Sequence, residues 1–277
     1  MADLSERTII ITGASRGIGR CMALRFARDG ANVVIAAKSA EPHPKLKGTI
    51  YTVAEEVEAA GGTALPFQVD VRFEGQVRAM VEATAQRFSR IDALVNNAGA
   101  ISLTNVENTS IKHYDLMQSI NARAVFLCSQ ATLPYLKESN NPHILSLAPP
   151  LNFSGVWLHD HAPYTLSKYG MTVLSLGMSE EFEKYGISVN CLWPKTIIAT
   201  AAIEFAVGSR DTFKYCRKPE IMADAAHAIL TTEDRTLTGQ CLIDEELLRE
   251  RGITDLDHYA YDLEHAENLQ TDLFIDR

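Results

Sequence analysis

Residues 8–19 read TIIITGASRGIG, a β-branched run that passes directly into a turn with glycines at positions 13, 17 and 19. A run of this composition is typical of a buried strand, and apolar residues at helical spacing follow it until Asp29-Gly30 ends the helix. A strand, a glycine turn and a helix in this order direct free backbone N–H groups and the helix dipole at a phosphate. An isolated glycine cluster could be only a tight turn, but this context favours a nucleotide site.

Strand-like runs alternate with amphipathic helical stretches along most of the chain. The expected strands are Thr8–Thr12, Asn32–Ala37, Ala64–Val69, Ala93–Asn96, His143–Leu147, Ser188–Trp193 and Gln240–Ile243, and the clearest helices are Glu74–Phe88, Lys112–Lys137 and Tyr164–Tyr185. This alternation predicts an α/β fold, a single-domain, Rossmann-type, doubly wound and mostly parallel sheet of about seven strands with helices on both faces. In such folds, ligands bind beyond the carboxyl ends of the strands, where the strand order reverses.

Two segments exceed this minimal unit. Residues 39–50 form an insertion after the second strand, in which Pro42, Pro44 and Gly48 should prevent a helix. Residues 244–277 form a C-terminal tail that opens with a helix start and could cover either the site or a subunit contact. We expect a single domain over residues 1–277.

Composition narrows the class of protein. The chain has 277 residues, 46% of them hydrophobic, which is enough for one large core. A net charge of −9 and the lack of a long Lys/Arg run argue against nucleic-acid binding. The sequence has no apolar run long enough to predict a membrane-spanning helix and no visible secretory signal. Five cysteines without a Cys-x-x-Cys pair read as free thiols, so we expect a cytoplasmic protein.

A second motif, YTLSK at residues 164–168, places Tyr164 and Lys168 one turn apart on the same helical face. A free phenol has a pKa of about 10. A nearby ammonium group favours the phenolate and should lower the pKa of Tyr164 toward the working range. The pair can therefore act as an acid/base device, although a Tyr and a Lys at this spacing also arise often by chance.

Together with the glycine turn, Asn96-Asn97-Ala98-Gly99 and Asn121, this pair resembles the pattern of the short-chain dehydrogenase/reductase family. The matching motifs span roughly residues 8–200, and segments 36–46, 148–152 and 193–196 resemble one subgroup. The resemblance implies an oxidoreductase that interconverts a secondary alcohol and a carbonyl. In that reaction Tyr164 exchanges a proton with the substrate oxygen. Lys168 lowers the pKa of Tyr164 and holds the nicotinamide ribose, and Asn121, at a distortion of its helix, supports a proton relay through water behind the lysine.

The resemblance also implies a set of cofactor-binding residues. They are Gly13, Ser15, Arg16, Gly17, Ile18, Gly19, Lys38, Asp70, Val71, Asn97, Ala98, Gly99, Tyr164, Lys168, Pro194 and Thr196. Asp70 and Val71 look like the pair that reads the adenine, although Asp70 could instead be a helix cap or a turn aspartate.

Charge at the end of the second strand bears on which dinucleotide binds. Proteins that prefer NAD(H) usually place a carboxylate there, to accept from the ribose 2′-hydroxyl. This chain has Lys38 instead, with Arg16 inside the glycine turn. Two cations suit a 2′-phosphate, so NADP(H) is favoured over NAD(H), although both could be solvated surface charges.

The sequence departs from the family pattern where a catalytic serine is expected. Leu151 stands thirteen residues before Tyr164, and alignment on the end of the fifth strand gives Pro149. Neither side chain can donate a hydrogen bond, while Ser146 lies within the strand and Ser154 further along the loop. Loss of one such donor can cost about 10²–10³ in rate. A dinucleotide-binding protein with little or no catalysis, a sensor or scaffold, therefore stays open as an alternative.

Loops near the expected cleft give mixed signals. His159 and His161 lack a third ligand at a suitable spacing, so we expect no metal site. Phe153 and Trp157 are consistent with an apolar pocket wall or with core packing. Lys195 replaces the family's glycine and could face an acidic substrate, the cofactor phosphates or solvent.

Two expectations concern partners. Residues 201–213, with a break at Gly208-Ser209, suit a lid over an apolar substrate, of which lipids are one class. The family resemblance implies a homodimer or homotetramer whose contacts use the helices Lys112–Lys137 and Tyr164–Tyr185.

Overall fold

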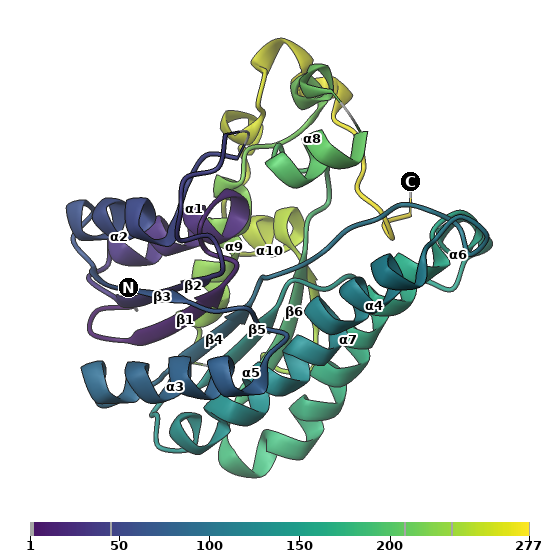
Figure 1. The fold of residues 1–277 in the computed structure, drawn as a ribbon. Coiled ribbons are helices and arrows are strands. Elements are labelled where there is room, and N and C mark those ends of the chain that lie inside the picture. The colour runs from purple at the N-terminus through teal and green to yellow at the C-terminus, as the bar shows by residue number, and fades with distance from the viewer. Residues whose placement is uncertain (1–2, 45, 208, 234, 277) are drawn as a thin grey trace.

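One parallel sheet organises the protein. The computed structural model describes residues 3–44, 46–207, 209–233 and 235–276. Within them, seven parallel strands pair in the order β3-β2-β1-β4-β5-β6-β7 (Figure 1). The strands are β1 (Thr8–Thr12), β2 (Asn32–Ala37), β3 (Thr63–Gln68), β4 (Ala93–Asn96), β5 (His143–Ser146), β6 (Ser188–Trp193) and β7 (Cys241–Ile243). The predicted doubly wound sheet is confirmed.

Helices cover both faces of this sheet. They are α1 (Gly17–Ala27), α2 (Ile50–Ala59), α3 (Glu74–Phe88), α4 (Ile111–Ile120), α5 (Ala122–Leu136), α6 (Gly155–His159), α7 (Ala162–Phe182), α8 (Ala201–Val207), α9 (Glu220–Leu230) and α10 (Asp244–Glu250). Helices α1, α2 and α9 lie on one face, and α3, α5 and α7 on the other (Figure 1). Short 3₁₀ turns occupy Glu183–Tyr185, Arg210–Tyr215, Asp257–Tyr259 and Leu263–Asn268.

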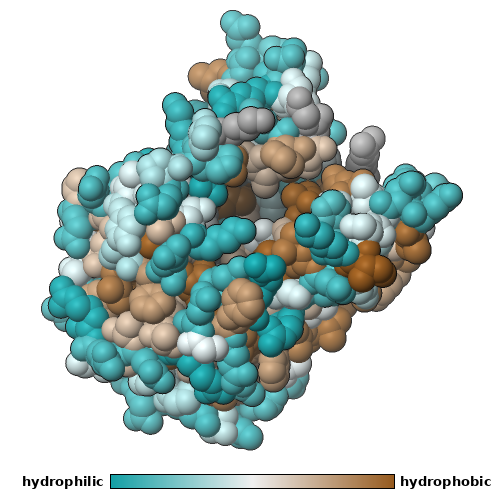
Figure 2. Space-filling model, in the orientation of Figure 1, coloured by the Kyte–Doolittle hydropathy of each residue, from teal (hydrophilic) through white to brown (hydrophobic). Residues whose placement is uncertain are grey.

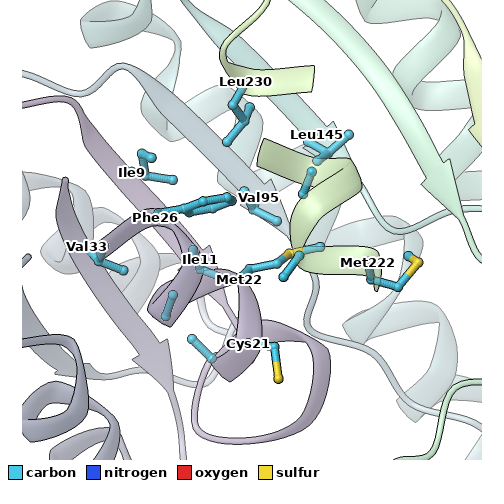
Figure 3. Close-up of a cluster of buried hydrophobic side chains, with 14 of the residues drawn as sticks. Ile9, Ile11, Cys21, Met22, Phe26, Val33, Val95, Leu145, Met222 and Leu230 are labelled. Atoms are coloured by element: carbon cyan, nitrogen blue, oxygen red, sulfur yellow. The ribbon is translucent and has the colours of Figure 1, made fainter. Parts of the chain in front are cut away.

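Strand β1 illustrates why the sheet needs two covered faces. Ile9 and Ile11 point into the core that packs against α1 and α9, whereas Ile10 points into the core on the α3–α5–α7 side. Successive side chains of a strand alternate between faces, so an all-apolar strand must be buried on both. Figure 3 shows Phe26 and Met22 of α1 beside Ile9 and Ile11 in the first of these cores.

The predicted strand boundaries are correct to within one residue, but the helix predicted over 112–137 is wrong. The helix expected over 112–137 is two helices, because the backbone breaks at Asn121, where φ is −85° and ψ −90°. The side chain of Asn121 pairs with the main chain of Ala100 instead of facing solvent, and a continuous helix would not hold it there. The helix expected over 164–185 ends at Phe182 and tightens into a 3₁₀ turn before Gly186, where φ is +67°.

The insertion after β2 is a loop, as its prolines predict, with Lys45 outside the described residues. Helix α2 begins at Ile50, and Thr49 caps it through reciprocal hydrogen bonds with Thr52. Gly48 lies directly against the glycine turn, since a Cβ at this position would stand 2.3 Å from the Ser15 carbonyl oxygen. The loop therefore packs beside the predicted nucleotide site. Within the described residues, every helix is too short or too polar to cross a bilayer.

We predict that Gly19→Ala destabilises the fold. A Cβ on Gly19 would lie 2.5 Å from Asn97 Nδ2 and 2.8 Å from the Gly13 carbonyl oxygen, so backbone has to move. Overpacking of this kind lowers the free energy of unfolding by about 1–3 kcal/mol. Gly75→Ala is the matched control in α3, where nothing lies within 4 Å of a new Cβ, and its stability should be unchanged or up to about 1 kcal/mol higher. Urea unfolding measures both, and parent-like stability of Gly19→Ala would contradict the prediction.

Candidate active site

The glycine turn follows β1 at the point where the sheet order reverses. Its first residue, Gly13, has φ of +69°, and its N–H donates to the Ala36 carbonyl at 2.7 Å. Helix α1 then starts at Gly17, and the preceding Arg16 provides no side-chain cap. The first N–H groups of a helix have no partner within the helix and carry the positive end of its dipole. This end of α1 is therefore suited to an anionic ligand.

Asn97 joins the glycine turn to the end of β4. Its Nδ2 donates to the carbonyls of Thr12 at 2.7 Å and Gly13 at 3.2 Å. In return, the Thr12 hydroxyl accepts from the N–H groups of Asn97 and Ala98, each at 3.0 Å. A Cβ on Gly13 would lie 2.9 Å from Ala98 Cα, so the two segments are in close contact. Two motifs 84 residues apart thus form one rigid unit.

Two cations lie near this turn in different settings. Arg16 donates from Nε and Nη2 to the carbonyls of Lys47 and Gly48, so part of its guanidinium holds the insertion loop. Lys38 is exposed at the end of β2. The pKa of Asp70 is lowered, chiefly by hydrogen bonds from Arg72 and in part by the charge of Lys38.

The Asp70 carboxylate also accepts from the backbone N–H of Arg72, so it serves as a turn aspartate as well. Beside it, Val71 is buried in the core on the α3–α5–α7 side.

Tyr164 and Lys168 lie on the buried side of α7, only 4% and 7% exposed. Lys168 Nζ donates to the Leu147 carbonyl at 2.7 Å and lies 5.0 Å from the centre of the Trp193 ring. Asn121 donates from Nδ2 to Ser167 Oγ at 2.8 Å, and Ser167 in turn donates to the Tyr164 carbonyl. The break between α4 and α5 thus fixes the first turn of α7.

The expected lowering of the Tyr164 pKa by Lys168 is wrong for this structure. Burial raises the pKa of Tyr164 above its usual range, and the charge of Asp272 raises it further. Burial also lowers the pKa of Lys168 to about 8, although Asp272 opposes that change. The desolvation of both groups outweighs the attraction that their spacing along the helix suggested.

The loop after β6 completes this side of the site. Pro194 and Thr196 are buried, and Thr196 Oγ1 has no hydrogen-bond partner among the described residues. Lys195 turns away, because its Nζ pairs with Glu246 of α10 at 3.0 Å and its N–H donates to Asp244. The Lys195 ammonium group therefore lies at the surface in an ion pair with Glu246.

The comparisons with known proteins agree with this geometry. A family model described as short chain dehydrogenase matches residues 7–206. The chain belongs to the short-chain dehydrogenase/reductase family. Hydroxysteroid dehydrogenase-like protein 2 of Xenopus laevis is 57% identical over 273 residues, which are 99% of this chain and 64% of that protein. The chain therefore spans less than two-thirds of that relative's length.

Solved structures agree on the fold. A Xanthomonas campestris protein assigned as a dehydrogenase is 53% identical, with a TM-score of 0.95 over 99% of this chain and 100% of that one. A metagenomic short-chain oxidoreductase, solved in complex with NADP, is 26% identical, with a TM-score of 0.71 over 87% of this chain and 97% of that one.

Members of the short-chain dehydrogenase/reductase family bind a nicotinamide dinucleotide, and residues of this chain fit one. The uncapped start of α1 suits the pyrophosphate, and the Lys168 ammonium suits ribose hydroxyls. The unpartnered Thr196 hydroxyl suits a polar group at the nicotinamide end. A Cβ at Gly99 would lie 3.5 Å from Asn121 Oδ1, so Gly99 is a neighbour of the Asn121 side chain.

No serine takes the place of the family's catalytic serine. Ser146 is buried and accepts from Ser175 Oγ at 2.9 Å, on the side of β5 that faces α7. Ser154 is exposed before α6. The carbonyl of Pro149 accepts from Thr172 at 2.7 Å, which fixes the loop without supplying a donor.

The C-terminal tail packs over Tyr164, one of the two places that the sequence left open for it. Phe274 is buried against Tyr164, Tyr169 and Trp193, and the charge of Asp272 acts on both Tyr164 and Lys168. Sequence reasoning missed both tail residues. The available signal was an apolar segment, residues 273–275, in an otherwise acidic tail.

The two histidines of the loop separate. His159 is exposed and pairs with Asp160 at 2.6 Å, whereas His161 turns inward at the start of α7 and has an unpartnered Nε2. In the described ranges, no three His, Cys, Asp or Glu side chains form a group able to hold a metal. The segment expected to act as a lid forms α8 and a 3₁₀ turn, with Gly208 outside the described residues.

Proposed function

We propose that the chain is an NADP(H)-dependent oxidoreductase that interconverts a secondary alcohol and a carbonyl on an apolar substrate. The observation that supports it most is the hydrogen-bonded chain from Asn121 through Ser167 to the turn of Tyr164, with Lys168 beside it. This group lies at the carboxyl ends of the strands, next to the glycine turn, where ligands of doubly wound folds bind.

In the proposed reaction, a bound dinucleotide supplies or accepts the hydride. Tyr164 gives a proton to the substrate oxygen in reduction and takes it back in oxidation. The Tyr164 hydroxyl is protonated at neutral pH, the form that donates, while burial raises its pKa and makes the phenolate costlier to form. Lys168, fixed by the Leu147 carbonyl, would stabilise the phenolate that forms, because an ammonium group favours a neighbouring negative charge.

An apolar substrate is supported by the surface around the site. Phe205 of α8 is 84% exposed, and Phe153, Val156 and Leu158 are exposed on and before α6. Figure 2 shows a hollow on this face beneath α8, with hydrophobic residues gathered along the side toward α6. Exposed apolar groups around a hollow favour a ligand that removes them from water.

The cofactor preference rests on charge. Lys38 is exposed where an NAD(H)-binding protein would have a carboxylate, and Asp70 nearby is already paired with Arg72. The metagenomic relative was solved with NADP. We expect NADPH to bind at least about tenfold more tightly than NADH, and Lys38→Asp to raise the Kd of NADPH about 10–100-fold.

Titration calorimetry with both nucleotides measures this preference. Lys184→Asp is the matched control, because it makes the same charge change on the exposed turn that precedes the amino end of β6. Equal affinity of the parent protein for NADPH and NADH would refute the cofactor preference.

Tyr164→Phe tests the proposed chemistry. Without the hydroxyl no proton reaches the substrate oxygen, so kcat should fall about 10²–10⁴-fold while NADPH affinity stays close to that of the parent. NADPH consumption with a panel of apolar ketones gives the rate, and Tyr185→Phe, at a partly exposed tyrosine, is the control. Retained turnover in Tyr164→Phe would reject the role of Tyr164.

The absent serine keeps a second function in view, a dinucleotide-binding protein that acts as a sensor or scaffold. The same ketone panel separates the two functions. Stoichiometric NADPH binding by the parent protein with no turnover on any ketone would favour the second function over the first.

A homo-oligomer formed through α5 and α7 is also proposed. Phe126 on α5 and Leu166 and Val173 on α7 are about half exposed, and the latter two lie seven residues apart on one side of α7. A second copy of the chain would bury them. Val173→Glu should therefore dissociate a dimer or tetramer to monomer in light-scattering chromatography, while Tyr51→Glu, an equally exposed site on α2, should not. A monomeric parent protein would contradict this proposal.

A further inference from the structure

The C-terminal tail is tied down on both sides of Phe274. Before it, Thr271 forms an antiparallel bridge with Thr196, and the Asp272 N–H donates to the Lys195 carbonyl at 3.0 Å. Trp193 Nε1 donates to the Leu273 carbonyl at 2.9 Å. After it, Asp276 accepts from the side chain of Asn152 at 2.7 Å. These contacts fix the tail across the loops that follow β5 and β6.

Phe274 lies at the centre of the aromatic groups around Tyr164. Its side chain is only 1% exposed. Five rings lie within 6.3 Å of its own, measured between ring centres: Tyr169 at 5.3 Å, Trp157 and Trp193 at 5.9 Å, His161 at 6.2 Å and Tyr164 at 6.3 Å. The planes of Phe274 and Tyr164 are inclined by only 28°, so the two rings stack. The face of the proposed proton donor is therefore covered by a residue from the tail.

The backbone of Phe274 is strained in this position. Its φ is +69°, in the left-handed region that bulky residues rarely adopt. Such a conformation is unfavourable and persists only where the surroundings enforce it. Residues held in this way cluster at ligand-binding and active sites. In this backbone conformation the ring of Phe274 lies against the ring of Tyr164.

Two polar atoms of the same cluster have no partner. Trp157 Nε1 and His161 Nε2 are buried without a hydrogen bond among the described residues, although both rings contact Phe274. Buried polar groups are normally paired, so an unpaired donor marks a place where a ligand atom or water would bind. The cluster is thus apolar apart from two buried groups, the Trp157 Nε1 donor and His161 Nε2, which donates or accepts according to the tautomer of the ring.

We infer that Phe274 is a specificity-determining residue, whose ring fills the space beside Tyr164 and so limits the size of the substrate group that can lie there while its oxygen meets Tyr164. The inference rests on the proposed function and adds a substrate class to it. That class is a carbonyl or alcohol carried by a narrow apolar skeleton. Phe274 limits the width of the skeleton, since its ring occupies the space beside the Tyr164 ring.

The tryptophans of this chain make the inference directly measurable. The sequence has two, Trp157 and Trp193, and both contact Phe274. Intrinsic fluorescence therefore reports on this cluster without any turnover. Titration with cyclic ketones of one, two and three fused rings, with and without NADPH, gives a Kd for each, and NADPH consumption gives kcat/KM.

The size ratio is the affinity, or the kcat/KM, for the three-ring ketone divided by that for the one-ring ketone. Phe274→Ala should raise this ratio about tenfold or more, because it opens space beside Tyr164. Phe274→Leu keeps the site apolar and should give a smaller change in the same direction, which covers the case of a poorly folded alanine variant. Tyr261→Ala removes an exposed aromatic ring from the same tail and should leave the ratio unchanged.

The outcomes separate the two proposals. If the parent protein turns over ketones but neither Phe274 variant alters the size ratio, the inference about Phe274 is wrong and the proposed reaction stands. If no ketone is turned over yet the fluorescence size ratio shifts in the Phe274 variants alone, Phe274 does shape the site and the proposed reaction is wrong. A purely structural role would lower the thermal stability of Phe274→Ala without moving the ratio.

Discussion

The structure depends on the hydrogen bonds that join the ends of β1 and β4. The Asn97 amide and the Thr12 hydroxyl each bond to the other strand's end, so the glycine turn cannot move independently of the loop that carries Ala98 and Gly99. A Cβ at Gly13 or Gly19 would collide with the Asn97 side chain, so both positions need glycine for contact, and Gly13 needs it also for its φ of +69°. This unit sets where α1 starts and, through it, where an anionic ligand would lie.

The second constraint is burial of charge. Lys168 is enclosed by the Leu147 carbonyl, the Met171 sulfur and the Trp193 ring, and Asp272 is the carboxylate whose charge acts on it. Burial raises the pKa of Asp272 to about 7, while its bond from Leu273 and the charge of Lys168 oppose that rise. Burial thus disfavours the charged form of both groups, and the pKa of Asp272 lies well above that of an exposed carboxyl. As the pH falls through the raised pKa of Asp272, its carboxyl takes up a proton and Lys168 loses its counter-charge.

Features that depend on neighbouring residues were predictable from the sequence, whereas features that depend on contacts between distant residues were not. The strands and the glycine turn were predictable because β-branched runs and glycine spacing are local signals. The break at Asn121 was not predictable from periodicity, since apolar spacing continues through it. Its cause is a contact with Ala100, 21 residues away in the sequence. Lys195 shows the same limit, because only the fold brings Glu246 within reach of its ammonium group.

The pKa of Tyr164 shows why a motif can give the right residues and the wrong electrostatics. Helical spacing puts Tyr164 and Lys168 on the same buried side of α7, but the pKa of each depends on how much water it loses, and Phe274 of the tail is among the residues that cover Tyr164. The loop after β5, which supplies a serine elsewhere in the family, here has Pro149 and Leu151 at the two positions where that serine is expected, and the Pro149 carbonyl accepts from Thr172. The tail adds Phe274, stacked on Tyr164, and Asp272, whose charge acts on Tyr164 and Lys168. Substrate orientation in this chain would then depend on aromatic packing and on a buried charge, and less on a hydroxyl donor.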